Sequence, residues 1–446
     1  MKNFRRLPAF CLTFCLILAS AILPAQALDY SADLTVNADS VLLMDADNDE
    51  VLFAQDPDAR HFPASITKVM TGLLAVEAVE AGKLTMDQQV TLGGDLYTGI
   101  GEGGSTQNLK TGETLTVRDL LNCALIPSAN EACNALADLV SGTIPDFVDR
   151  MNEYAAELGM TGTHFVNPHG YHDDNHYTTA RDIYLLCREA IKHPDFRTVV
   201  SSTTYVVPPT NMTPTQRTLH DTNALISTNK TNAYLYEYAI GIKTGSTPEA
   251  GHCLASAAVK DGRTLICVVL GAQDFKEDAQ DNYFQLSRDL LEMGFNDFSR
   301  QTILSGIDPV ATLPVALCPD LYDITVQPVK ELTATLPKDF DMAQFQRTVE
   351  LPASLEAPLK QGQVVGKLTL TLNGETYGAV DLAVTADLER SQLLYVLDRT
   401  GKFFDQLWVK LVLIVLGLGI VILVVRHLLF GSKKDRYGRK KGYRGR

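Results

Sequence analysis

An uncharged apolar run at residues 411–425 constrains this chain more than any other feature of its sequence. With its flanks, where Lys410 and Arg426 can extend toward the lipid surface, the run reaches roughly 24 residues and about 36 Å of helix, enough to cross a bilayer. A dense basic tail follows, which the positive-inside rule places in the cytoplasm. A buried helix of a soluble domain is the alternative, and the tail disfavours it. The sequence therefore predicts a transmembrane helix at 406–430 and a cytoplasmic tail at 431–446.

The first 27 residues have the pattern of a secretory signal peptide. A basic start precedes the apolar stretch 10–23, and Ala25-Gln26-Ala27 is a small-residue cleavage site. An uncleaved membrane anchor is the alternative, but the apolar stretch is short and Pro24 interrupts it. We therefore expect residues 1–27 to be removed and the middle of the chain to lie outside the cytoplasm.

Charge follows the same division of the chain. The net charge is -14, but residues 1–27 carry +3 and residues 406–446 carry +9, so residues 28–405 carry -26. Such an acidic middle argues against a nucleic-acid partner and against a surface that binds anionic lipid. With 46% hydrophobic and 21% charged residues, the chain is neither disordered nor fibrous.

Eight cysteines are present, and the six outside the signal lie mostly in apolar segments without a Cys-x-x-Cys pair. This pattern indicates buried thiols rather than a disulfide framework or a metal site, with a single disulfide left open.

Hydrophobic periodicity predicts one α+β domain over residues 28–300. Two strands at 40–45 and 50–54 flank a polar turn and open the domain as a hairpin. The further expected elements are helices at 67–81, 117–125, 130–140 and 144–158, strands at 240–244, 251–259 and 264–271, and a helix at 282–293. This order predicts an antiparallel sheet built from both ends of the domain.

From residue 301 the pattern changes to short alternating segments interrupted by proline. The clearest pair, 367–372 and 376–384, encloses Asn373-Gly374, which is typical of a type I′ hairpin turn. We expect a small all-β domain at 301–388, acting as a spacer, and a linker at 389–405 before the membrane.

Three short motifs carry the chemistry. Ser65-Ile66-Thr67-Lys68 is a Ser-x-x-Lys, Ser128-Ala129-Asn130 is a Ser-x-Asn, and Lys243-Thr244-Gly245 is a Lys-Thr-Gly. Single matches are common, since Ser227-Thr228-Asn229-Lys230 satisfies both serine patterns and Lys110-Thr111-Gly112 repeats the third. Order and context favour the first set, although Ser227 stays a minor alternative for the middle motif.

Each motif residue also has a purely structural interpretation. Ser65 could cap a helix, Asn130 could begin one, and Gly245 could serve a turn. Taken together, in this order and on these elements, the three motifs are improbable by chance.

The motif set has the logic of an activated serine. A spacing of three on a helix brings Ser65 and Lys68 within hydrogen-bond reach, so a neutral lysine amine can take the hydroxyl proton. Burial, together with the charge of Lys243, would lower the pKa of Lys68 enough for that. Ser128 can relay a proton to the leaving amine, and Asn130 can fix Lys68 and donate to a substrate amide.

The third motif offers an extended binding edge. Gly245 lets a peptide approach as an added strand, and Lys243 and Thr244 attract a terminal carboxylate. The backbone N–H groups of Ser65 and Ser246 are placed to hold the acyl oxyanion.

In these motifs the chain resembles the serine D-alanyl-D-alanine carboxypeptidases, low-molecular-mass penicillin-binding proteins related to serine β-lactamases. Its signature segments are matched by Pro63-Ala64-Ser65-Ile66-Thr67-Lys68, Pro127-Ser128-Ala129-Asn130-Glu131-Ala132, Asn167-Pro168-His169-Gly170, His176-Tyr177-Thr178-Thr179-Ala180-Arg181-Asp182 and Gly241-Ile242-Lys243-Thr244-Gly245-Ser246-Thr247. The resemblance covers about 30–300, and more loosely the β domain. The chain departs from the family at two positions. Ser246 occupies a position where histidine is frequent, and Asp278 lies near the position where some relatives have a basic residue.

The resemblance implies a sheet packed between helix clusters and an enzyme that needs no cofactor. The implied reaction trims the terminal D-alanine from peptidoglycan stem peptides through an acyl-serine at Ser65, with β-lactam antibiotics as covalent inhibitors. A DD-endopeptidase acting on cross-links, a β-lactamase-like hydrolase and an inactive wall-binding scaffold are the alternatives. A class A β-lactamase needs a glutamate for deacylation, and Glu131 is expected in the helix after Ser128, where it cannot act so.

One cluster resembles a metal site. It consists of His164, His169, His172 and His176 with Asp173 and Asp174. Its spacings do not match a closed zinc set, and two of the histidines belong to signature segments, so we expect no metal.

Overall fold

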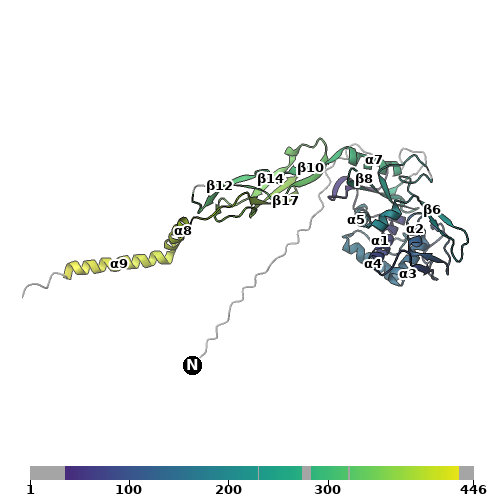
Figure 1. Cartoon of the computed structure of the whole chain (residues 1–446), viewed down its shortest axis with the longest axis horizontal. Coiled ribbons are helices and arrows are strands. Elements are labelled where there is room, and N and C mark those ends of the chain that lie inside the picture. Colours follow the sequence, from purple (N-terminus) through teal and green to yellow (C-terminus); the bar gives the residue numbers. More distant parts are fainter. Residues whose placement is uncertain (1–35, 230, 274–282, 320–321, 431–446) are drawn as a thin grey trace, which may run out of the picture. The chain divides into compact units, whose positions relative to one another are not determined.

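Residues 36–229, 231–273, 283–319 and 322–430 are described by a computed structural model of the chain, which divides into two units (Figure 1). The first unit runs to Gln301 and includes Ala334–Asp341, and the second holds Thr302–Thr333 and the chain from Met342 onward. The predicted signal peptide, the basic tail and Asp278 lie outside the described residues.

The first unit is built on a five-stranded sheet in the order β2-β1-β9-β8-β7, with every neighbouring pair antiparallel. The strands are β1 (Ser40–Asp45), β2 (Glu50–Gln55), β7 (Ala239–Thr247), β8 (Gly251–Lys260) and β9 (Arg263–Ala272). The sheet thus joins both ends of the domain, as the sequence predicts. β7, which carries the Lys-Thr-Gly motif, lies at an edge of the sheet.

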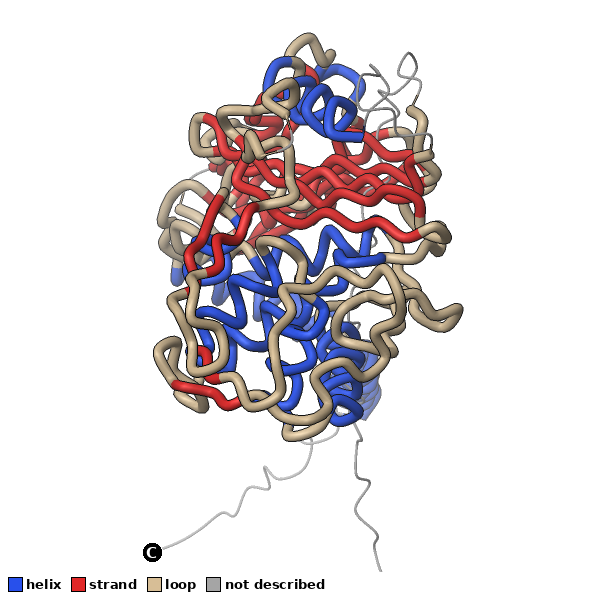
Figure 2. The backbone as a smooth tube through the Cα atoms, turned by 90° about the vertical axis from the view of Figure 1, so that its right-hand side faces the viewer, coloured by secondary structure: helices blue, strands red, loops and turns tan. Residues whose placement is uncertain are grey.

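Both faces of this sheet are buried, because alternate residues of its central strands enter two different cores. On β1, Leu42 and Met44 pack into one core, and Val41 and Leu43 pack into the other. The first core is formed with helices α1 to α6, and the second with α7, so the sheet lies between helix layers (Figure 2). This confirms the predicted α+β sandwich of helices and sheet.

Most helices of this unit lie where the sequence predicts them, and α5 and α6 are additional. They are the 3₁₀ turn η1 (Ala64–Thr67), α1 (Lys68–Glu80), α2 (Val117–Leu125), α3 (Asn130–Ser141), α4 (Ile144–Glu157), α5 (Ala180–Ala190), α6 (Pro194–Val200) and α7 (Tyr283–Asn296). Thr116 and Asp119 cap α2 reciprocally, each side chain accepting from the other's backbone N–H. Two small hairpins complete the unit: β3 (Gln89–Thr91) with β4 (Thr114–Thr116), and β5 (Thr204–Val207) with β6 (Arg217–His220).

The second unit is dominated by a six-stranded sheet in the order β14-β16-β17-β12-β11-β15. The strands between residues 298 and 384 are β10 (Phe298–Leu304), β11 (Ala311–Ala316), β12 (Tyr322–Pro328), β13 (Leu332–Pro337), β14 (Gln346–Glu350), β15 (Leu355–Glu356), β16 (Val364–Leu372) and β17 (Glu375–Val384), with a 3₁₀ turn η2 (Met342–Gln344). The β16–β17 hairpin turns at Asn373 and Gly374, whose φ angles of 53° and 86° are both positive, as a type I′ turn requires.

One segment inside the predicted β domain packs with the first unit instead. Within Ala334–Asp341, Thr335 Oγ1 donates to Asp45 Oδ2 at 2.8 Å, and Asn48 Nδ2 donates to Thr335 Oγ1 at 3.0 Å. Such long-range polar contacts leave no trace in local periodicity. The domain boundaries predicted from the sequence therefore stay a prediction.

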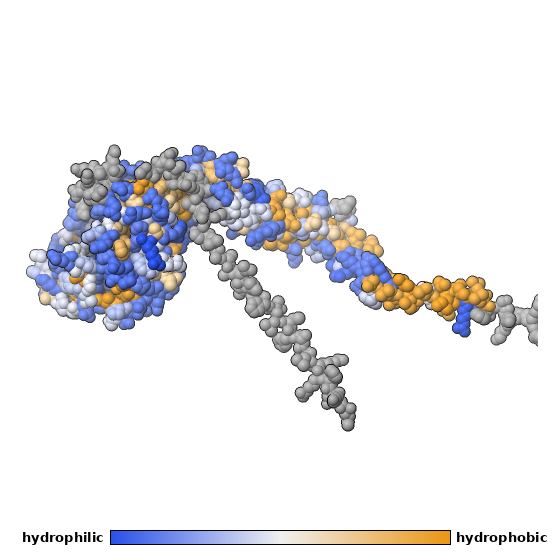
Figure 3. All heavy atoms as spheres, turned by 180° about the vertical axis from the view of Figure 1, so that it is seen from behind, coloured by the Kyte–Doolittle hydropathy of each residue, from blue (hydrophilic) through white to orange (hydrophobic). Residues whose placement is uncertain are grey.

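Two helices end the described chain. α8 (Gln392–Asp405) occupies most of the expected linker, and α9 (Leu407–Phe430) follows it after one residue. α9 is long and apolar enough to cross a membrane, and its side chains are almost wholly exposed, so it presents a nearly continuous apolar surface (Figure 3). This agrees with the predicted span.

Candidate active site

Ser65 and Lys68 meet at the start of the central helix. Ser65 lies in η1, and Lys68 is the first residue of α1, where its Nζ donates to Ser65 Oγ at 2.7 Å and to the backbone oxygen of His169 at 2.6 Å. The sequence predicts an α-helical first turn at Ser65, whereas the structure has a tighter 3₁₀ turn, which still brings residues three apart together.

Lys68 is completely buried, and this burial governs its chemistry. Removal from water disfavours the charged ammonium and, with the nearby positive charge of Lys243, lowers the pKa of Lys68 from 10.5 to about 7. A large fraction of Lys68 is therefore neutral near neutral pH. Its lone pair can then accept a proton from the Ser65 hydroxyl.

The segment 167–171 forms the wall behind this pair. Gly170 has φ of +79°, and a Cβ placed there would lie 1.8 Å from the backbone oxygen of Ala64, so only glycine fits. Asn167 Oδ1 accepts from the Gly170 N–H at 2.7 Å and shapes the turn. This close packing fixes the His169 carbonyl that accepts from Lys68.

His176 supports the 3₁₀ turn η1 through a contact with Thr67. Its Nε2 lies 2.8 Å from Thr67 Oγ1, which in turn donates to the backbone oxygen of Ala64 at 2.9 Å. Burial lowers the pKa of His176 to about 3, so the ring is neutral. Because Nδ1 accepts from the Val166 N–H, Nε2 carries the proton and donates to Thr67.

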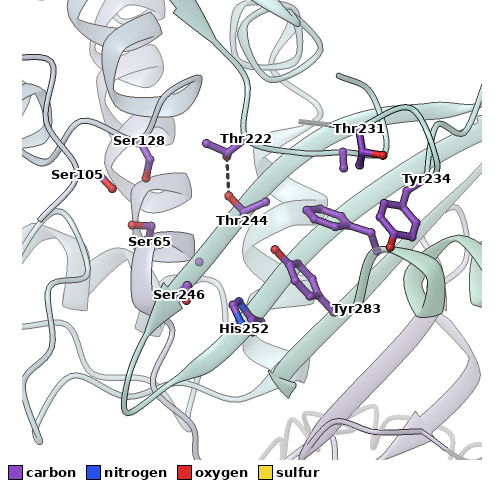
Figure 4. A pocket seen from close by; sticks show the side chains of 13 residues that line it. Ser65, Ser105, Ser128, Thr222, Thr231, Tyr234, Thr244, Ser246, His252 and Tyr283 are labelled. Carbon is purple, nitrogen blue, oxygen red and sulfur yellow. Dashed lines mark hydrogen bonds between the residues drawn. The ribbon is translucent and has the colours of Figure 1, made fainter. Parts of the chain in front are cut away.

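Ser128 faces Ser65 from the junction of α2 and α3. It is buried, adopts a left-handed φ of 72°, and its Oγ has no hydrogen-bond partner among the described residues. Figure 4 shows the hydroxyls of Ser65, Ser105 and Ser128 gathered around one space. A strained backbone that aims an unpaired hydroxyl at a cavity is typical of a functional position.

Asn130 is the first residue of α3, two positions after Ser128. Its backbone N–H donates to the Ser105 carbonyl at 2.9 Å, which ties the loop at 101–105 to the helix start. The residue is buried and lines the cleft on the side of this loop.

The Lys-Thr-Gly motif lies opposite, on the edge strand β7. Lys243 is buried and donates from Nζ to the Thr244 carbonyl at 3.2 Å, and Thr244 Oγ1 lies 2.6 Å from Thr222 Oγ1. A Cβ on Gly245 would lie 3.0 Å from the Pro63 carbonyl oxygen and 3.2 Å from the Ser65 nitrogen. Glycine here lets the strand approach the nucleophile closely, while Ser246 stays exposed at the cleft.

Two adjoining cavities form a cleft on either side of the nucleophile. The first has about 500 Å³ and contains Ser128, Thr222 and Thr244. The second has about 570 Å³ and contains Asn130. Both share Ser65, Ser105 and Ser246. The structure thus brings together seven of the eight predicted site residues as cavity lining or partners of Ser65, and Lys243 lies buried beside Thr244.

Sequence reasoning missed several residues of the cleft. Ser105, Thr222, Tyr234, His252 and Tyr283 line the first cavity but belong to none of the three motifs. The polar run Asp221-Thr222-Asn223 before an apolar segment was a weak local signal for Thr222. For the others, only the folded sheet and loops bring them to Ser65.

The competing motif matches lie elsewhere. Ser227 is buried, its Oγ accepts from the Asn229 N–H, and it does not line the described parts of the cleft. Lys110 is exposed and donates to the Met212 carbonyl. Glu131 is buried, and its Oε1 accepts from Thr106 Oγ1 and the Gln107 N–H, so it holds a loop rather than a water at Ser65.

The histidines of the candidate metal cluster are dispersed among structural roles. His169 and His176 are buried behind Lys68, and His172 contacts Asp174 and Glu249. Over the described part of the chain, no group of three metal-ligating side chains comes together. The six cysteines in the described residues are buried free thiols.

Comparison with known proteins gives a consistent result. Residues 26–274 match the family model for D-alanyl-D-alanine carboxypeptidase, and residues 322–390 match that for the C-terminal domain of penicillin-binding protein 5. The chain is 30% identical over 372 residues to the D-alanyl-D-alanine carboxypeptidase DacF of Bacillus subtilis, covering 83% of this chain and 90% of DacF.

Solved structures agree with these matches. Penicillin-binding protein 5 of Haemophilus influenzae superposes with a TM-score of 0.61 and 28% identity, covering 80% of this chain and 99% of that one. Penicillin-binding protein D2 of Listeria monocytogenes, solved in its cefotaxime-bound form, has a TM-score of 0.50 and 30% identity, covering 59% and 99%.

Proposed function

The chain belongs to the D-alanyl-D-alanine carboxypeptidase family of serine peptidases, and we propose that Ser65 is the nucleophile with which it removes the terminal D-alanine from peptidoglycan stem pentapeptides. The observation that carries this proposal is the 2.7 Å hydrogen bond between Lys68 Nζ and Ser65 Oγ, together with a lysine pKa lowered to about 7. A buried neutral amine next to a hydroxyl is the arrangement that activates a serine without histidine.

In the acylation step, Ser65 Oγ attacks the carbonyl carbon of the penultimate D-alanine while Lys68 accepts the hydroxyl proton. The backbone N–H groups of Ser65 and Ser246 stabilise the oxyanion. The carbon–nitrogen bond then breaks, and the proton passes through Ser128 to the leaving amine. D-alanine departs and an acyl ester remains on Ser65.

In the deacylation step, water attacks the ester carbon and restores Ser65. We assign Lys68 as the base for this water, because Glu131 accepts hydrogen bonds from the loop at 106–109 instead. The edge strand β7 supports binding of the stem peptide as an added strand, with Asn130 donating to a peptide carbonyl from the opposite side.

β-Lactam antibiotics acylate the same serine in this proposal. The structural likeness to a penicillin-binding protein solved with cefotaxime bound supports this inhibition. Opening of the strained lactam ring uses the same nucleophile, oxyanion donors and proton relay. Because the ring carbonyl stays attached to Ser65, the product blocks the cleft.

We also propose where the enzyme works. The span α9, the predicted signal peptide and the basic tail support a single-pass membrane protein whose catalytic unit lies outside the cytoplasm. The acidic middle of the chain would then face the cell wall, which contains the peptide substrate.

The test uses a fluorescent penicillin and a stem pentapeptide on the full chain in membranes. We expect a covalent label on the wild type and none on Ser65→Ala, with Ser227→Ala labelled normally as the matched control. Release of free D-alanine from the pentapeptide supports the carboxypeptidase. Cleavage of a cross-linked dimer without D-alanine release would instead indicate the endopeptidase. A label retained by Ser65→Ala would overturn the assignment of Ser65 as the acylated residue.

A further inference from the structure

The first cavity of the cleft is suited to an anion. Ser128, Thr222 and Thr244 are among the residues that contribute hydroxyl groups to its lining, and His252 adds an imidazole. Among the described residues that line this cavity, His252 is the one side chain able to carry a positive charge, and none is a carboxylate. A carboxylate entering here would therefore meet hydrogen-bond donors, with no like charge among the lining residues that the structure describes.

The second cavity has the opposite character. Glu102 and Glu249 line it, and His172 Nδ1 lies 3.9 Å from Glu249 Oε2. Glutamates repel a carboxylate at close range. The substrate's terminal carboxylate, which belongs to the leaving D-alanine, thus has one favourable side of Ser65, and that is the side of His252.

Strand register brings His252 to this side. On the antiparallel pair β7–β8, Ser246 is the residue directly opposite His252, so the two side chains point to the same face of the sheet. Ser246 follows the Lys-Thr-Gly motif and lines the cleft next to the nucleophile. Figure 4 shows the His252 ring between Ser246 and Tyr283, facing the cavity.

An aromatic wall holds the imidazole in this orientation. His252 stacks on Tyr283, with ring centroids 5.2 Å apart and the planes inclined by only 6°. Tyr283 contacts Phe284 at 4.2 Å between centroids, and Phe284 stacks on Tyr234 at 5.9 Å. A ring fixed in this way donates an N–H with little further loss of conformational entropy.

We propose that His252 is a specificity-determining residue that donates a hydrogen bond to the terminal carboxylate of the substrate. The inference deepens the proposed function and rests on it. An imidazole has an N–H in both its neutral and its charged form, so the contact does not require one protonation state. One hydroxyl of the Thr222–Thr244 pair donates to the other, and the pair leaves one O–H as a neighbouring donor. β8 thus adds a binding residue that lies outside the three motifs.

The experiment compares two thioester substrates with the same N-acyl-D-alanyl donor. One has thioglycolate as leaving group, which carries a carboxylate, and the other has its neutral methyl ester. We expect His252→Ala to lower kcat/KM for the thioglycolate about tenfold, mainly through KM, the size of one hydrogen bond to a charged group. The neutral substrate should change less than twofold.

Two further variants separate recognition from packing. His252→Phe keeps a ring against Tyr283 without a donor, and we expect the same loss of carboxylate preference as with alanine. His252→Gln keeps an N–H donor and should retain part of the preference for the carboxylate substrate. His220→Ala removes an exposed histidine on β6 that does not line the cleft, and it should match the wild type for both substrates.

The outcomes distinguish a failure of the role of His252 from a failure of the proposed acyl-serine function. An unchanged ratio between the two substrates in the His252 variants, or an equal loss for both, would overturn the role of His252 while Ser65 labelling stays intact. A wild type that neither cleaves thioesters nor labels at Ser65 would overturn the proposed function itself.

Discussion

The buried amine of Lys68 sets how the reaction should depend on pH. Burial, aided by Lys243, lowers the pKa of Lys68 to about 7, and only the neutral form can accept the Ser65 proton. We expect the acylation rate with a fluorescent penicillin to rise as pH increases through about 7 and then level off. Stopped-flow labelling from pH 5 to 9 measures this. An acid limb centred near 10, the pKa of an ordinary lysine, would contradict it.

His176 should make the first unit sensitive to acid. Its folded pKa of about 3 lies below the 6.5 of an exposed histidine, so the unfolded chain binds a proton that the folded chain does not between these values. Stability therefore falls as pH decreases from 6.5 toward 3, by a few kcal/mol in order of magnitude.

Chemical denaturation at pH 7, 6, 5 and 4 tests this contribution. We expect His176→Gln to be less stable at pH 7, because Thr67 loses its donor, but to lose less stability on acidification than the wild type. The matched control is His220→Gln, which makes the same replacement at an exposed histidine on β6. A His176→Gln curve parallel to the wild type would refute the assignment.

At the scale of single residues, the sequence predicts the motif side chains but not what surrounds them. Ser65, Lys68 and Ser128 are recognisable because catalysis requires fixed residue types at fixed spacing. His252 and Thr222 are not, because their positions in the cleft depend on strand register and on loops whose partners lie far away in sequence.

At the scale of elements, the turn that carries Ser65 depends on the loop behind it. Gly170→Ala would place a methyl group 1.8 Å from the Ala64 carbonyl oxygen, at a φ of +79°. We expect a loss of at least about 3 kcal/mol of stability and of nearly all penicillin labelling, because η1 or the loop must move.

Gly159 offers a matched control for this substitution. It has the same φ of +79°, but no atom lies within 4 Å of a Cβ built there. Gly159→Ala should therefore cost only the left-handed conformation, about 1–2 kcal/mol, and leave labelling intact. Thermal unfolding and labelling of both variants make the comparison. Equal effects at the two glycines would show that the contact with Ala64 does not matter.

The apolar pattern of the sequence located most, but not all, of the helices and strands of the first unit. α2 (Val117–Leu125) matches its predicted bounds, and the ends of β7 to β9 deviate by at most three residues. α5 and α6 have no counterpart among the predicted elements, and α8 is a helix within the expected linker. The apolar side chains of α8 are exposed, so α8 is not part of the core of the β domain.

At the scale of the whole molecule, the charge distribution predicts how the chain lies across the membrane. Residues 28–405 carry -26, and residues 406–446, which comprise α9 and the tail after it, carry +9. We expect a protease added to intact spheroplasts to remove the catalytic unit and leave an epitope tag after Arg446 protected. Digestion of the tag without membrane permeabilisation would reverse the proposed topology.

Anchoring and catalysis should also be separable. The cleft around Ser65 lies wholly in the first unit, and α9 belongs to the second. A chain that stops after Gln406 lacks the only span found among the described residues, so alkaline carbonate should extract it from membranes, whereas the full chain should need detergent. Its kcat/KM on a dissolved pentapeptide should stay within about twofold of the full chain, because α9 contributes no residue to the cleft. Loss of activity on the dissolved substrate would show that α9 acts on the catalytic unit, and retention of the truncated chain after carbonate would show that another segment anchors it.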